Sequence, residues 1–423
     1  MHAERKLTLL GRTFDGFERS LTSQFAEIED LPARHRLIEI DELERLVVHG
    51  EATKSGEFDL MLLVSDWFPA LISDGRLLAL DDAFANRAPD GWPDAWVPGM
   101  RSLQKGPDGR TYGVAYHDGP MLLLYRTDLY SDVGEQRGFA ERFGYRLKPP
   151  ANWTEFRDQA MWFTRPDDGL YGTVLAGYPD EHNNVYDFLT HLWSRGGDLI
   201  TPEGRSGLAG AAARSAVDYL HKLWHVDAVV DPAAASWDSV ASGIHFANGE
   251  AAMMLNWCGF AALSADPESP THGVIGCAPA PGEDGPGGTA ITLNAYWALC
   301  VPSGATDPER SIELIRRITS HEMDVKTALA GGSATRIDSW NDPRVQAVAP
   351  YYGVLEQAHK HSRSVPDDPR WPRIAGILNA MMDLVVSRDS EPREALAQAH
   401  AKLDELLIAT GEHALRSKLD RPA

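Results

Sequence analysis

Apolar residues in the N-terminal part of the chain occur both as short continuous runs and at helical spacing. The continuous runs predict buried strands at 6–10, 35–40 and 58–64. The helical spacing predicts a first helix with apolar residues at Phe14, Phe17, Leu21, Phe25 and Ile28. A second helix is predicted from Asp41, a candidate N-cap, to Gly50 or Gly56. This order predicts a parallel sheet covered by helices, with ligands at the carboxyl ends of its strands, here 11–13 and 65–67.

The rest of the chain continues to mix strands and helices. Residues 112–130 (YGVAYHDGPMLLLYRTDLY) predict a strand, a polar crossing at His117 and Asp118, and a longer strand. Further strands are predicted at 171–177, 251–255 and 295–302, and helices at 152–164, 308–319 and through most of the C-terminal third. The sequence contains no internal repeat and no low-complexity linker, which favours a second domain inserted into the first. The predicted fold class is α/β.

Length and charge narrow the class of partner. The 423 residues exceed the usual size of a single core, so two domains are expected. The net charge of −21 argues against nucleic acid or an anionic membrane surface as a partner. No run approaches the length of a membrane span, and the N-terminal stretch lacks the features of a secretory signal. Two expectations remain open: a cytoplasmic protein, or a mature form that follows a removed signal.

Three cysteines, Cys258, Cys277 and Cys300, are too few for a disulfide framework. All three lie in apolar surroundings, so buried thiols are expected. A single bridge between Cys277 and Cys300 is the alternative.

The motifs of several enzyme classes are missing from the sequence. There is no phosphate-binding loop, dinucleotide fingerprint, zinc-binding HExxH or paired cysteines at metal spacing, and GGSAT at 331–335 is not a nucleophile elbow. We therefore expect no metal and no cofactor. His359 and His361 alternate in a polar segment and are predicted to be solvated surface. Acidic residues are abundant throughout the chain, so the sequence does not single out Asp66 or Asp118 as a general acid.

A different pattern recurs, in which an aromatic residue lies beside a polar one at a predicted strand end. The examples are Arg12, Asp66-Trp67, Tyr116-His117-Asp118, Gly177-Tyr178, Asn256-Trp257, Asn294 with Tyr296, and the turn that ends at Arg336. Polar groups that orient a ligand, within apolar walls that exclude water, are typical of a small-molecule site. The twelve tryptophans add flat faces that suit a sugar.

Six segments, in order, resemble the extracellular solute-binding proteins of ABC sugar importers, the maltose-binding-protein-like group. They are FDLMLLVSDWFPALISDGRLLALDDAF, DGRTYGVAYHDGPMLLLYRTDLY, NWTEF, FANGEAAMMLNW, RRITSHEMDVKTALA and GGSATR. The sequence departs from the family pattern where Ala115 and Ala334 replace the usual prolines, in the order of Trp and Thr in NWTEF, and in the absence of a signal peptide or lipobox cysteine.

The resemblance implies two α/β lobes joined by crossing segments, with a ligand cleft between the lobes that closes by hinge motion. The N-terminal lobe would hold residues 1–115 and 294–342, and the C-terminal lobe 116–293 and 343–423. Family contacts, with their neighbours at the same strand ends, would fall on Arg12, Ser65, Asp66, Trp67, His117, Asp118, Gly177, Tyr178, Trp257, Asn294, Tyr296 and Arg336. Trp67 and Trp257 would stack on a sugar ring, Asp118 would accept from hydroxyl groups, and Arg12 and Arg336 would donate.

The function implied is capture of a sugar or an anionic sugar derivative for the membrane permease of an ABC importer. The protein would be a monomer, periplasmic or extracellular, and associated with lipid or the cell wall. A glycan-processing enzyme and a sensor on the same scaffold are the alternatives. In this reading His117 and Asp118 form a binding clamp rather than a catalytic pair, and Arg126 and Asp128 are structural.

Overall fold

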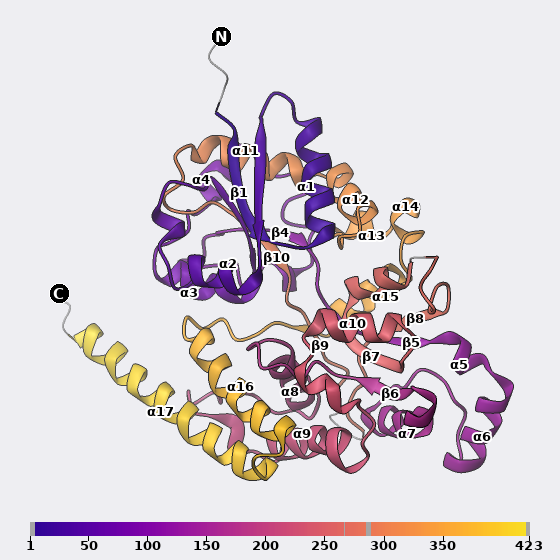
Figure 1. Cartoon of the computed structure of the whole chain (residues 1–423). Coiled ribbons are helices and arrows are strands. Elements are labelled where there is room, and N and C mark those ends of the chain that lie inside the picture. Colours follow the sequence, from indigo (N-terminus) through magenta and orange to yellow (C-terminus); the bar gives the residue numbers. More distant parts are fainter. Residues whose placement is uncertain (1–4, 266, 285–288, 420–423) are drawn as a thin grey trace. The chain divides into compact units, whose positions relative to one another are not determined.

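The computed structural model describes residues 5–265, 267–284 and 289–419, which form two compact units (Figure 1). Unit 1 comprises Met1–Pro120 and Asn294–Trp371, and unit 2 comprises Met121–Leu293 and Pro372–Ala423. Each unit is therefore built from two separate stretches of the chain. Residues 279–288 are rich in Pro and Gly, which predicts a loop, and residues 285–288 of this stretch lie outside the described residues.

The division differs from the expected one in the C-terminal part of the chain. Residues 343–371 group with unit 1, although they were expected in the second lobe. The reason is local packing: α14 (Pro343–Gln346) contacts α12 (His321–Leu329), and α15 (Tyr352–His359) contacts α13 (Ile337–Trp340). These short helices thereby extend the helical layer of unit 1.

The core of unit 1 is a five-stranded sheet in the order β2-β1-β3-β10-β4. Its strands are β1 (Leu7–Arg12), β2 (Ala33–Ile38), β3 (Leu60–Val64), β4 (Val114–His117) and β10 (Trp297–Cys300). Strands β2 and β3 both pair with β1 in parallel, which confirms the predicted parallel arrangement. Strand β10 enters from the distant second stretch and pairs antiparallel with both β3 and β4.

Helices surround this sheet, and α1 packs against α12 (Figure 1). The remaining elements of unit 1 are α1 (Asp15–Glu27), α2 (Ile40–Val47), α3 (Phe68–Ser73), α4 (Asp81–Asn86), α11 (Pro308–Ile318) and β11 (Ser362–Arg363). Helix α2 begins one residue before the predicted N-cap Asp41, and its N-cap residue is Glu39. Helix α1 buries Phe17, Leu21 and Phe25, as the helical spacing predicts.

Unit 2 contains a four-stranded sheet in the order β6-β7-β5-β8. Its strands are β5 (Met121–Arg126), β6 (Tyr171–Val174), β7 (Ala251–Trp257) and β8 (Ile275–Ala278). Strand β5 is antiparallel to β7 and β8, whereas β6 and β7 are parallel. The predicted structural role of Arg126 is confirmed by its two hydrogen bonds to Asp128, at 2.8 and 2.5 Å.

Helices also cover the sheet of unit 2, and α9 contacts both α8 and the C-terminal α17 (Figure 1). The remaining elements are α5 (Thr127–Ser131), α6 (Val133–Phe143), α7 (Trp153–Phe163), α8 (Asn183–Ser194), α9 (Ala211–His221), α10 (Ser239–Ala247), β9 (Thr292–Leu293), α16 (Trp371–Ser387) and α17 (Pro392–Leu419). Asn152 caps the N-terminus of α7, since its side chain accepts a hydrogen bond from the Glu155 N–H at 2.7 Å. Helix α8 is followed by Gly196, whose φ of 73° is left-handed and ends the helix.

Two further expectations can be checked within this fold. Cys277 and Cys300 are unbridged thiols, and burial raises the pKa of Cys277 to about 12. Among the described residues, the helices are all too short or too polar to cross a membrane.

Candidate functional site

In unit 1, the predicted strand-end residues meet at one edge of the sheet. Trp297, the first residue of β10, is paired with Val64, the last residue of β3, and with His117, the last residue of β4. Strand β1 runs parallel to β3, so Arg12 ends at the same edge. The topology therefore gathers the ends of three strands and the start of a fourth, as expected for a ligand edge in an open α/β sheet.

Ser65, Asp66 and Tyr296 are joined directly at this edge. The Ser65 N–H donates to the Tyr296 carbonyl at 2.8 Å, and the Ser65 hydroxyl donates to an Asp66 carboxylate oxygen at 3.0 Å. The Tyr296 hydroxyl donates to Gln104 at 3.1 Å and its ring is fully buried. Trp67 is also buried, with 3% of its surface exposed. These contacts give Tyr296 and Trp67 a packing role and leave little ring surface for stacking on a solute.

The neighbouring part of the edge combines a cation with aromatic rings. The Arg12 guanidinium lies 6.0 Å from the centre of the Trp297 ring. Phe17 contacts both Trp297 and His117 edge to face, with ring centres 5.4 and 4.9 Å apart. Trp297 was not among the candidate residues, although its position at the start of a strand next to Tyr296 was a usable signal.

His117 is held in its neutral form with a defined tautomer. Its Nδ1 accepts a hydrogen bond from the Ser333 N–H at 2.8 Å, so the proton of the neutral ring is on Nε2. Burial, and secondarily the positive charge of Arg12, lowers the pKa of His117 to about 3. At neutral pH this ring therefore offers an N–H donor and no charge.

Asp118 is fully buried, and both of its carboxylate oxygens have partners. One oxygen accepts from the Gly119 N–H at 3.0 Å, and the other lies 2.8 Å from Nε2 of His359. The prediction that His359 is solvated surface is wrong: its side chain is 2% exposed and stacks on Trp340 with ring centres 5.0 Å apart. The polar neighbours of His359 in sequence concealed this long-range contact. These two partners hold Asp118, the residue after β4, so its carboxylate does not face a solute freely.

Arg336 has a structural environment within unit 1. It is 1% exposed, and its guanidinium forms paired hydrogen bonds to Asp338 at 2.9 and 2.8 Å. Its Nη1 group donates to the carbonyls of Asp90 and Thr319 at 2.7 and 3.2 Å. Four N–H groups of Arg336 donate within unit 1, so its guanidinium is not placed to donate to a solute as expected.

Asn294 differs from Arg336 in the hydrogen bonding of its side chain. It is 1% exposed, and neither its side-chain oxygen nor its side-chain nitrogen has a hydrogen-bond partner among the described residues. Its backbone is fixed, since its N–H donates to the Arg363 carbonyl at 2.9 Å. A buried amide without partners is rare and points to a missing polar partner.

In unit 2, Gly177-Tyr178 and Trp257 lie at a common sheet edge, because they follow or end the parallel strands β6 and β7. Gly177 is closely packed: a Cβ atom there would lie 2.8 Å from the Ala234 carbonyl oxygen. The Tyr178 ring is 49% exposed. Trp257 is half-buried, and its indole N–H donates to the Asn183 side chain at 3.1 Å.

Sequence reasoning missed a polar group at the start of α8, beside Trp257. Asn183 accepts from Trp257, and Asn184 donates to Asn379 at 3.1 Å. One side-chain oxygen of Asn184 and one of Asp187 are buried without a hydrogen-bond partner in the described residues. Burial, and secondarily the charge of Asp180, raises the pKa of Asp187 well above its usual value. The signal was the polar stretch EHNN, whose two asparagines begin a helix that is buried along its whole length.

Each unit thus presents aromatic surface and hydrogen-bonding groups at one edge of its own sheet. Arg12, Ser65, Asp66, His117 and Asn294 are in unit 1, and Gly177, Tyr178 and Trp257 are in unit 2. Across the described ranges, three or more His, Cys, Asp or Glu side chains nowhere form a group suited to a metal ion. Such an arrangement can orient a small polar molecule through hydrogen bonds and ring contacts.

Comparisons with known proteins identify the family and the fold of the chain. The family model of the bacterial extracellular solute-binding proteins matches residues 45–324. A probable ABC transporter-binding protein of Deinococcus radiodurans is 22% identical over 304 residues, which cover 70% of this chain and 69% of the relative.

Solved structures show a similar fold along nearly the whole chain. The maltose-bound MalE3 of T. maritima is 24% identical with a TM-score of 0.81, over 95% of this chain and 99% of that protein. A ribitol-bound ABC transporter solute-binding protein of Agrobacterium radiobacter is 21% identical with a TM-score of 0.82, at the same coverage. The sugar-binding protein MalE of Xanthomonas citri is 18% identical with a TM-score of 0.76, over 99% of this chain and 100% of that protein. The chain belongs to the family of bacterial extracellular solute-binding proteins.

Proposed function

We propose that this protein binds a neutral, polyhydroxylated solute, a sugar or a sugar alcohol, and releases it chemically unchanged. The observation that carries the proposal is the neutral N–H donor of His117 beside Arg12 and Trp297 at the ligand edge of unit 1. A donor without charge suits a hydroxyl oxygen, which accepts a hydrogen bond and needs no counter-ion.

Aromatic surface supports the same class of solute. Trp257 and Tyr178 in unit 2 keep part of their rings exposed, at the ends of β7 and β6. The C–H faces of a sugar pack favourably on such rings, while its hydroxyl groups need polar partners. The unpartnered amide of Asn294 and the buried oxygens of Asn184 and Asp187 are suited to be such partners.

The charge of the site favours a neutral solute over an acidic one. Two arginines, Arg12 and Arg336, and the histidine His117 would allow an anionic sugar derivative if all three carried positive charge to the site. Because Arg336 is held by Asp338 and His117 is neutral, the case for an acidic group rests on Arg12. The maltose and ribitol bound by two proteins of similar fold also support a neutral polyhydroxylated solute.

We propose that no reaction accompanies binding. Acid and base catalysis on a glycosidic bond requires two carboxyl groups that both face the substrate. Asp118 has both oxygens engaged by Gly119 and His359, and Asp66 accepts from Ser65. Neither carboxylate is thereby suited to be the acid of such a pair.

Family membership supports three further proposals. The partner would be the membrane permease of an ABC importer, the protein would act outside the cytoplasmic membrane, and it would be monomeric. The two units would act as the lobes of a solute receptor, with 1–120 and 294–371 in one lobe and the remainder in the other.

A thermal-shift screen tests the proposal. Maltose, ribitol, mannitol, glucuronate and a sulfated sugar are added separately, and a true ligand raises the Tm in proportion to ln(1 + [L]/Kd). A saturable shift with a neutral sugar or polyol supports the proposal. A shift with glucuronate or the sulfated sugar alone would contradict the neutral class. Chromatography shows whether a stabilising sugar is converted during incubation with the protein. Conversion would contradict binding without reaction.

A further inference from the structure

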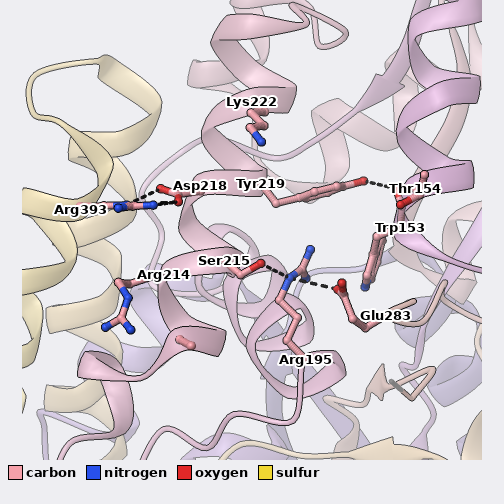
Figure 2. Close-up of a pocket in the computed structure, with 11 residues that line it drawn as sticks. Trp153, Thr154, Arg195, Arg214, Ser215, Asp218, Tyr219, Lys222, Glu283 and Arg393 are labelled. Carbon is pink, nitrogen blue, oxygen red and sulfur yellow. Dashed lines mark hydrogen bonds and ion pairs between the residues drawn. The ribbon is translucent and has the colours of Figure 1, made fainter. Parts of the chain in front are cut away.

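A pocket within unit 2 contains none of the candidate solute-binding residues (Figure 2). Its volume of about 380 Å³ is within the range of small-molecule sites. The walls come from the start of α7, the end of α8, one face of α9, the loop at Glu283 and the start of α17. Every lining residue belongs to unit 2, so the pocket is complete within that unit.

One face of α9 forms the longest wall. The lining positions recur every three or four residues, at Ala211, Arg214, Ser215, Asp218, Tyr219 and Lys222. The opposite face buries Ala213, Ala216, Val217 and Leu220 in the core of the unit. The helix ends in a π-helical turn at Lys222–Val226, an irregularity that often marks functional positions.

The pocket carries an excess of positive charge in a strongly acidic protein. Four cations, Arg195, Arg214, Lys222 and Arg393, face only two carboxylates, Asp218 and Glu283. Arg393 pairs with Asp218 at 2.8 Å, and Arg195 lies 3.1 Å from Glu283. Neither Arg214 nor Lys222 has an ion pair within the described part of the chain, and Figure 2 shows both side chains at the wall of the pocket.

Arg195 is fixed and largely buried at the base of this group. Its side chain is 6% exposed, and its Nε–H donates to the Ser215 hydroxyl at 3.1 Å. Its Nη1 group contacts the His191 ring nitrogen and carbonyl, both at 3.0 Å. Glu283 pairs with this cation through one oxygen, although among the described residues that contact does not have the geometry of a hydrogen bond. A held guanidinium of this kind is preorganised to receive an anion.

Aromatic groups provide an apolar wall next to these cations. The Arg195 guanidinium lies 5.0 Å from the centre of the Tyr219 ring, and the Tyr219 hydroxyl donates to the Trp153 carbonyl at 2.8 Å. The Trp153 ring is buried, at 2% exposure, and packs against Tyr219 with ring centres 6.0 Å apart, so Tyr219 supplies the exposed part of this wall. A ligand with a hydrocarbon part could rest there while its charged end meets the cations.

We propose that this pocket of unit 2 is a second ligand site, which binds a small organic anion through Arg195, Arg214 and Lys222. The anionic group is a carboxylate or a phosphate, and the apolar part lies on Tyr219, which the buried Trp153 ring supports from behind. The site is independent of the proposed solute site, because the two sets of residues do not overlap.

The test uses the full-length chain, with citrate and inorganic phosphate as separate probes at constant ionic strength, and sodium chloride as the reference. The double variant R214Q/K222Q removes the two cations that lack ion pairs. The matched control K105Q/R373Q removes two exposed cations elsewhere and gives the same change in net charge. The Tm of both variants without probe should be close to that of the unmodified protein, because all four residues are on the surface.

We expect a saturable rise in the Tm of the unmodified protein with at least one probe. Calorimetry should give a Kd that is about tenfold or more higher in R214Q/K222Q, because the loss of each charged hydrogen bond lowers the affinity by about that factor. The control K105Q/R373Q should keep the original Kd. A response to citrate alone identifies a carboxylate site, and a response to phosphate alone identifies a phosphate site. Equal affinity in both double variants, or no effect beyond that of sodium chloride, would overturn the proposal. Sugar binding by R214Q/K222Q should be unchanged, so failure of one proposal is distinguishable from failure of the other.

Discussion

His359 Nε2 lies 2.8 Å from Oδ2 of Asp118, and both side chains are buried in unit 1. The contact joins the end of α15 to the residue that follows β4. It therefore fixes the backbone next to His117, which carries the proposed donor. The nearly parallel stack of His359 on Trp340, at an interplanar angle of 9°, holds the imidazole in this orientation.

Replacement of His359 should destabilise unit 1. His359→Ala leaves a buried Asp118 oxygen without its partner, which costs about 1–3 kcal/mol in the free energy of unfolding. At about 2–4 °C per kcal/mol, the Tm should fall by several degrees. The matched control is His361→Ala, two residues later and exposed, which should change the Tm little. Equal effects of the two substitutions would mean that the Asp118 contact does not stabilise the fold.

Arg336 should matter for stability and not for solute affinity. Arg336→Lys cannot reproduce the paired hydrogen bonds to Asp338, so we expect a lower Tm. The control Arg344→Lys alters an exposed ion pair and should have little effect. Calorimetry below the unfolding range should give an unchanged Kd for the solute. A large loss of affinity without a loss of stability would contradict this prediction and indicate that Arg336 contacts the solute.

The low pKa of His117 predicts a dependence of stability on pH. The folded protein resists protonation of this ring until about pH 3, whereas the unfolded chain binds the proton near 6.5. The unfolded state therefore binds more protons in this window, and stability falls as the pH decreases from 6.5 towards 3. One such group contributes a slope of about 1.4 kcal/mol per pH unit. Urea unfolding of His117→Gln at several pH values should show a correspondingly shallower decline, and identical slopes would contradict the assigned pKa shift.

Asp187 predicts a pH dependence of stability that is opposite in sign to that of His117. Its pKa is raised, so the folded state holds a proton that the unfolded chain releases above pH 3.8. Stability from this group is therefore lost as the pH rises. Asp187→Asn keeps the size of the side chain and removes the titration, so it should raise the Tm more at pH 8 than at pH 5. A Tm lower than that of the unmodified protein at pH 8 would indicate a charged, well-paired carboxylate instead.

Local patterns were sufficient to predict much of the fold. The strand–helix order up to β3 and the parallel pairing of β1 with β2 and β3 depend on residues close in sequence. The central position of β10 could not be predicted, because its partners β3 and β4 are far away in the chain. The same reason explains why residues 343–371 were expected in the other lobe.

Prediction of the site was limited by side-chain partners that are remote in sequence. The shared edge of Arg12, Ser65 and His117 follows from strand order, which the sequence pattern indicates. The partners of Asp118 and Trp257, His359 and Asn183, lie 241 and 74 residues away. Arg336 and Asp338 are two residues apart, but only the fold shows that Arg336 is buried.

Calorimetry of the unmodified protein and Trp257→Ala, with the neutral sugar or polyol that gives the largest thermal shift, tests the central claim most directly. We predict saturable binding of one solute per chain, recovered unchanged after the titration. In Trp257→Ala the affinity should fall by about 1–3 kcal/mol, because ring contact and the link to Asn183 are lost. Trp257→Phe, which keeps a ring, should lose less. Binding of equal strength in Trp257→Ala, or no binding of any neutral sugar or polyol to the unmodified protein, would contradict the account.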